Sequence, residues 1–90
     1  MADPLTLHID PTPNPNSMKI TVNRTVSPKP ESAFTVEEAA RNPLARALFE
    51  IPGVASVFLL NNFVTISRTP AVPWETVLPA AEAAVRKHLA

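Results

Sequence analysis

The fold of this chain is decided by residues 42–67, which read NPLARALFEIPGVASVFLLNNFVTIS. Asn42 is a favourable N-cap for a helix that begins at Pro43, because a proline at the first helical position loses no hydrogen bond. Pro52 interrupts the helical pattern, and Gly53 supplies the positive φ that a helix exit or tight turn often needs. One apolar helix face is predicted from residues at helical spacing: Leu44, Ala47, Leu48 and Ile51.

The second half of the same stretch predicts a β-hairpin. Residues 54–60 are rich in β-branched and aromatic side chains, as strands prefer, and residues 63–67 repeat this composition. Asn61 and Asn62 separate the two runs, and asparagine tolerates the backbone of a two-residue hairpin turn better than most residues. The middle of the chain is therefore predicted to be a helix that leads into a hairpin.

Toward the N-terminus, apolar and polar residues alternate in two further segments, as in strands with one buried face. The alternating apolar positions are Leu5, Leu7 and Ile9 in the first segment and Met18, Ile20 and Val22 in the second. Between them, residues 11–16 read PTPNPN, and this run of prolines and asparagines predicts a stiff, extended loop. Strands joined so closely are expected to pair antiparallel.

The rest of the chain predicts one irregular connection and two helical segments. Residues 24–33 contain Pro28 and Pro30 and are expected to be irregular, with at most a short extended piece near Thr25 or Phe34. Thr35 and Glu38 have the spacing of a capping box, which predicts one or two helical turns over residues 36–41. A final helix is expected over residues 73–88, with an irregularity near Pro79. Its apolar stripe consists of Trp74, Val77, Leu78, Ala81, Val85 and Leu89.

This order, β-β-α-β-β-α, predicts an α+β fold in two layers, a four-stranded, mainly antiparallel sheet with helices on one face. Residues 1–90 are expected to form a single domain. Phe58, Phe63 and Trp74 are expected to belong to the core, with Phe63 partly exposed at the hairpin tip. The helix-free face is expected to be partly solvated and to carry Thr6, His8, Lys19, Thr21, Thr65 and Ser67.

The composition of the chain excludes several classes of function. The formal net charge is zero, which gives no electrostatic footprint for nucleic acid or an anionic membrane. The absence of cysteine excludes disulfides, thiolate metal ligands and a cysteine nucleophile from these residues. The first residues lack the charged and apolar segments of a signal peptide, and no apolar run is long enough to span a membrane. We therefore expect a cytoplasmic protein without a membrane partner.

Two stretches together resemble one family. Residues 12–20, TPNPNSMKI, and residues 42–67 are similar to the N-terminal domain of Nfu/NifU-type iron–sulfur cluster scaffold proteins, and Trp74-Glu75 and Leu78-Pro79 match its final helix. The resemblance implies an α+β fold and a place in iron–sulfur cluster assembly or delivery. In full-length scaffolds a separate domain with a C-x-x-C motif holds the cluster, and this chain has no cysteine. The resemblance thus implies a module that docks a scaffold or client protein without ligating the cluster itself.

The candidate partner-binding residues are Thr12, Asn14, Pro15, Asn16 and Phe63. A proline-stiffened loop loses little entropy when it docks, although the same loop is equally explained as a rigid connector whose asparagines bond their own backbone. An exposed aromatic side chain at a hairpin tip is a suitable docking anchor.

Catalysis and metal binding find little support. No Gly-rich phosphate loop and no nucleophile with a recognisable base is present, so we expect no enzymatic activity, no cofactor and no metal site. Direct weak iron binding through His8, Asp10 or His88 is kept as an alternative, although these residues lack metal-ligand spacing. A nucleic-acid-binding module is a further alternative, because a four-stranded sheet with two helices resembles RNA-recognition folds. The zero net charge and the absence of tyrosine argue against it.

Overall fold

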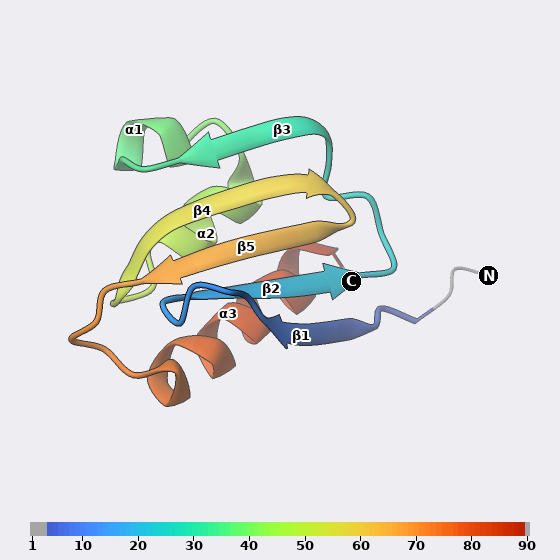
Figure 1. The fold of residues 1–90 in the computed structure, drawn as a ribbon. Coiled ribbons are helices and arrows are strands. Elements are labelled where there is room, and N and C mark those ends of the chain that lie inside the picture. The colour runs from blue at the N-terminus through green and yellow to red at the C-terminus, as the bar shows by residue number, and fades with distance from the viewer. Residues whose placement is uncertain (1–3, 90) are drawn as a thin grey trace.

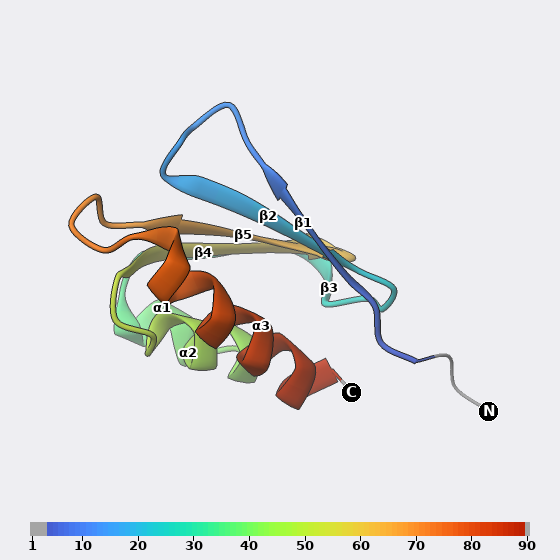
Figure 2. The ribbon, with the colours of Figure 1, turned by 90° about the horizontal axis from the view of Figure 1, so that it is seen from below.

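A computed structural model describes residues 4–89 and shows a five-stranded antiparallel sheet in the order β1-β2-β5-β4-β3 (Figure 1). The strands are β1 (Leu7–Pro11), β2 (Ser17–Val22), β3 (Ser27–Ala33), β4 (Val54–Asn61) and β5 (Phe63–Arg68). The helices are α1 (Val36–Ala39), α2 (Pro43–Phe49) and α3 (Trp74–Leu89). They lie on one side of the sheet and leave the other face uncovered (Figure 2). The predicted α+β class with helices on one face is confirmed.

The predicted strand count of four was wrong, because residues 27–33 form β3 and not an irregular connection. Pro28 and Pro30 suggested a break, but β3 is an edge strand and pairs only with β4. A proline on an edge strand can direct its missing N–H away from its neighbour without loss of a ladder hydrogen bond. The register between β3 and β4 is irregular between Ser27 and Glu31, where the two prolines lie.

The central stretch folds as its local signals predict. The side-chain oxygen of Asn42 accepts hydrogen bonds from the N–H groups of Leu44 and Ala45, at 2.9 and 3.3 Å, and Pro43 opens α2. Gly53 has a φ of 98° between α2 and β4. Leu44 and Leu48 are buried as expected, but the third buried residue of α2 is Ala45, whereas Ala47 is half-buried.

The β4–β5 turn is the predicted two-residue turn, since Leu60 pairs with Phe63 across it. Asn61 has a φ of 50°, in the left-handed region that asparagine tolerates. The carbonyl of Asn61 accepts from Val26 at 2.6 Å, and that of Asn62 accepts from Val22 at 2.8 Å. The turn therefore also holds the segment that joins β2 to β3.

The other two helices also begin largely as predicted. The hydroxyl of Thr35 accepts from the N–H of Glu38 at 3.2 Å, and the Glu38 carboxylate accepts from the N–H of Phe34 at 3.1 Å. The return bond of the capping box thus reaches one residue further back than expected. Helix α3 is continuous through Pro79, so the expected irregularity does not interrupt it. None of the helices among the described residues is long and apolar enough to cross a membrane.

The core lies between the helices and one face of the sheet. Val77, Ala81 and Val85 of α3 are fully buried and face the same layer as Leu44 and Leu48 of α2. The buried hydrophobic residues contributed by β2, β4 and β5 are Ile20, Val22, Val54, Val57, Leu59, Val64 and Ile66. Apart from Val54, which precedes a register shift in β4, these positions alternate along the strands, so the residues between them lie on the uncovered face.

Candidate functional site

The predicted loop, residues 12–16, lies at the end of the sheet where β2 begins and β5 ends. Two other segments meet it there: Gly53 at the start of β4, and residues 68–74 between β5 and the first turn of α3. We call this assembly the proline-rich end. The segments that carry the family resemblance, TPNPN, Pro-Gly and Trp-Glu, are distant in sequence and converge here.

The loop is held in shape by its own side chains. The hydroxyl of Thr12 accepts from the N–H of Asn14 at 3.1 Å and lies 2.9 and 3.1 Å from the carbonyl oxygens of Asn14 and Ser17. The side-chain oxygen of Asn14 accepts from the N–H of Asn16 at 2.8 Å, which is an Asx turn. The expected stiff connector is therefore present, and Pro13, Asn14 and Pro15 are exposed on it.

Trp74 and Arg68 attach this loop to the rest of the fold. The indole N–H of Trp74 donates to the carbonyl of Pro15 at 3.0 Å, and the N–H of Arg68 donates to the carbonyl of Asn16 at 2.8 Å. The Arg68 guanidinium lies 5.4 Å from the centroid of the Trp74 ring and also donates to the carbonyl of Val72 at 2.9 Å. The first two contacts cross to the loop and the last two hold residues 68–74 together, so the loop is braced and not merely tethered by β1 and β2.

Gly53 closes the proline-rich end from the side of β4. Its carbonyl accepts from the N–H of Thr69 at 2.8 Å. A Cβ atom at this position would lie 2.7 Å from the Cβ and Cγ1 atoms of Val72, well inside van der Waals contact. Glycine is thus required here twice, by its positive φ and by this close approach.

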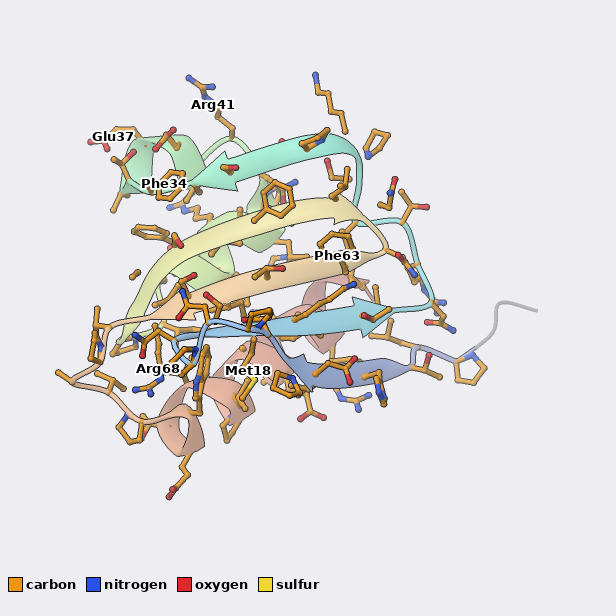
Figure 3. The ribbon with its side chains drawn as sticks, viewed as in Figure 1. Met18, Phe34, Glu37, Arg41, Phe63 and Arg68 are labelled. Carbon is orange, nitrogen blue, oxygen red and sulfur yellow. The ribbon has the colours of Figure 1, made fainter. Side chains whose placement is uncertain are left out.

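The structure does not bring the fifth predicted site residue to this assembly. Phe63 pairs with Thr21 at the start of β5, whereas Arg68 ends that strand beside the loop (Figure 3). Five residue steps along a strand correspond to about 17 Å. The loop and Phe63 are therefore two separate candidate contacts.

The expectation that Phe58 and Phe63 belong to the core was wrong, although the expected partial exposure of Phe63 is confirmed, and Trp74 does pack against the core. Both phenylalanines are half-buried on the uncovered face, with ring centroids 6.2 Å apart, and the Lys19 ammonium lies 4.4 Å from the Phe63 centroid. Residues 57–60 are all apolar, so alternation could not show which of them face the helices. The uncovered face thus has an aromatic pair among the expected polar residues.

The histidines considered for iron binding lie in different layers of the fold. His8 is on β1 and forms an exposed ion pair with Asp10, with Nε2 and Oδ1 3.1 Å apart. His88 is in the last turn of α3, beside a shallow hollow between α2 and α3. Within residues 4–89, no group of three or more His, Cys, Asp or Glu side chains is arranged to hold a metal ion.

A second hollow, of about 340 Å³, lies between β3 and the α1–α2 segment. Its lining includes Glu31, Arg41 and Asn42 but no residue of the predicted site. The Glu31 carboxylate accepts from the hydroxyl of the buried Ser27 and lies 3.5 Å from the side-chain nitrogen of Asn42. These contacts join β3 to the N-cap of α2, so a structural role explains them.

Comparison with known proteins decides the family. Residues 7–90 match the family model described as the N-terminal domain of scaffold protein Nfu/NifU. The chain belongs to this family. It is 33% identical over 78 residues to conserved virulence factor C of Staphylococcus aureus, a match that covers 87% of this chain but only 21% of that protein. The homologue from Staphylococcus haemolyticus is 36% identical over 73 residues, 81% of this chain and 20% of its own length.

Solved structures of similar proteins show the same fold for this Nfu/NifU N-terminal domain. A NifU-like protein from Saccharomyces cerevisiae superimposes with a TM-score of 0.79 and 26% identity over 94% of this chain and 78% of that one. The crystal structure of protein SAV1430 from Staphylococcus aureus gives a TM-score of 0.76 and 29% identity over 86% and 93% of the two chains. The recognised family is therefore supported by both sequence and structure.

Sequence reasoning missed the part that Arg68 plays in the site. Trp74 and Pro15 are 59 residues apart, and no local pattern signals their hydrogen bond or the stacked guanidinium. The only available signal was the co-occurrence of both segments in the family resemblance. Spatial convergence of such segments is what the structure adds.

Proposed function

We propose that residues 1–90 form one non-enzymatic protein-binding module in iron–sulfur cluster assembly or delivery, which docks a scaffold or client protein without ligating the cluster. Membership of the Nfu/NifU N-terminal family and the fold shared with a NifU-like protein support a role connected to iron–sulfur clusters. The chain has no cysteine, so these residues offer no thiolate to a cluster. A cytoplasmic location fits this composition.

The observation that carries the proposal is the pre-formed loop at the proline-rich end. Its exposed residues are fixed by prolines, by the Asx turn and by the bond from Trp74, so ordering them on binding costs little conformational entropy. Among the described residues, no hydrogen bond engages the side-chain amide of Asn16 or the side-chain nitrogen of Asn14. These polar groups are therefore available to a partner.

Phe63 is proposed as a second, separate contact on the uncovered face. It is half-buried beside Phe58 and under the Lys19 ammonium, which gives an apolar patch with one positive charge. A partner that reaches both contacts must extend along β5. Substitution at one contact should then weaken binding without abolishing it.

The test is anaerobic capture of the tagged protein from its host, with identification of co-purifying proteins. We expect a cysteine-containing cluster scaffold or apo-client to be enriched by the wild type and reduced with Asn16→Ala and with Asn14→Asp. The second change retains the oxygen that closes the Asx turn and replaces the amide donor with a negatively charged oxygen. Asn62→Ala is the matched control, since it removes an exposed carboxamide at the opposite end of the sheet.

Two results would contradict the proposal. If no protein of the iron–sulfur cluster pathway co-purifies, this chain shares the fold of the family but not the proposed role in cluster assembly or delivery. Equal capture by the wild type and both loop variants would instead place the interface elsewhere, and Phe63→Ser would then be the next variant to examine.

A further inference from the structure

The two edges of the sheet differ in their capacity to accept another strand. On β3, Pro28 and Pro30 lack N–H groups and the register is irregular, which are ordinary ways of blocking edge-to-edge pairing. Strand β1 pairs in regular register with β2 over all five of its residues and has no proline before Pro11. Within the described residues, no strand pairs with the edge of β1 that faces away from β2 (Figure 1).

The hydrogen bonds of β2 show which groups of β1 face this open edge. The N–H of Val22 donates to Asn62 and the carbonyl of Asn16 accepts from Arg68, so even-numbered residues of β2 direct their backbone groups toward β5 and the β4–β5 turn. Odd-numbered residues, Lys19 and Thr21, must then face β1.

The register between the two strands completes this assignment. Lys19 pairs with Asp10 and Thr21 pairs with His8, so these two residues of β1 bond to β2. The N–H and C=O groups of Leu7 and Ile9 consequently point outward, away from the sheet. The side chains of Leu7 and Ile9 are half-buried against the core, and they form an apolar ledge on the helix side of this edge.

We propose that β1 is a self-complementary edge through which two copies of this chain pair antiparallel about His8. Leu7 then lies opposite Ile9 of the second copy, and each such pair exchanges two backbone hydrogen bonds, about four in the dimer. On the helix side, the two apolar ledges come together, and the Leu7 side chain of each copy packs against the Ile9 side chain of the other. On the uncovered side, Thr6 lies opposite Asp10 of the second copy, which places a hydroxyl donor beside a carboxylate.

A second copy is the occupant that best satisfies all of these positions. The same register pairs apolar with apolar side chains and hydroxyl with carboxylate, and it leaves no two carboxylates directly opposed. The two-fold axis runs perpendicular to the sheet, so twice five strands form one continuous sheet with all helices on the same side. The interface is short, and the dimer is therefore a reversible, concentration-dependent one.

The test is sedimentation velocity of the full chain from about 10 μM to about 1 mM, the range in which weak association is measured. The wild type should shift from monomer to dimer with rising concentration. His8→Asp puts two carboxylates directly across the axis and should weaken dimerisation at least about tenfold, because like charges opposed across an interface are strongly unfavourable. His8→Asn is the matched neutral control and should dimerise within a few-fold of the wild type.

A second measurement identifies the edge itself. Amide hydrogen exchange of Leu7 and Ile9 should slow as concentration rises, whereas His8 and Asp10, already bonded to β2, should not change. Ile9→Pro removes an outward donor and should abolish dimerisation while His8 and Asp10 stay protected. A protein that remains monomeric throughout overturns the proposal, and so does a dimer that tolerates His8→Asp or leaves the Leu7 and Ile9 amides unprotected.

Discussion

The two ends of the sheet use asparagine in different ways. At the β4–β5 turn, Asn61 adopts a φ of 50° and Asn62 takes the second position of a two-residue turn. Their carbonyls hold the segment after β2 and the last residue of β2, respectively. A backbone requirement explains the residue type at Asn61, whereas the carbonyl bond made by Asn62 is open to any residue.

At the proline-rich end, backbone requirements explain only part of the sequence. Asn14 closes an Asx turn, but among residues 4–89 the side-chain amide of Asn16 takes part in no hydrogen bond, and Asn61 is the only non-glycine residue with a positive φ. Neither usual structural reason for asparagine applies to Asn16. The comparison therefore separates Asn61, whose residue type is explained by folding, from Asn16, whose side-chain amide is left for recognition.

The largest expected effect on stability is at Gly53. Gly53→Ala introduces a strained positive φ and a Cβ that overlaps Val72, so we expect a loss of about 3 kcal/mol in the free energy of unfolding. Chemical denaturation measures it. A loss below about 1 kcal/mol would show that residues 68–74 yield easily and that the proline-rich end is not rigid.

Asn61→Ala measures the stability cost of the left-handed backbone alone, at the opposite end of the sheet. It imposes the same left-handed strain without a close neighbour, and a loss of about 1 kcal/mol is expected. Asn61→Gly should stay within about 0.5 kcal/mol of the wild type, because glycine adopts this φ freely. If both variants are equally destabilised, the side chain of Asn61 has a role beyond the turn.

Trp74→Phe tests the brace on the loop. It keeps an aromatic ring against the core but removes the N–H that bonds the Pro15 carbonyl, and we expect a loss of about 1 kcal/mol. Amide exchange or NMR relaxation should show residues 13–16 becoming more mobile while β4 and β5 stay unchanged. If the mobility of the loop is unaltered, its own hydrogen bonds from Thr12 and Asn14 are enough to keep it rigid without Trp74.

The sequence predicts the caps of α1 and α2, the hairpin turn and the helix-on-sheet layers, because each depends on neighbouring residues. It does not predict β3, since Pro28 and Pro30 are compatible with a strand only at an edge, and edge position is a property of the whole sheet. It also misplaces Phe58, because an unbroken apolar run carries no period-2 signal. Contacts such as Trp74 to Pro15 join residues too distant in sequence for any local rule.

The most direct measurement of the central claim is the affinity of Asn16→Ala for the captured scaffold or client, compared with that of Asn62→Ala. Both variants should unfold within about 0.5 kcal/mol of the wild type, as surface substitutions usually do. We predict that Asn16→Ala binds at least about tenfold more weakly, the equivalent of about 1.4 kcal/mol, while Asn62→Ala binds like the wild type. Equal affinities for the two variants would contradict docking through the proline-rich end.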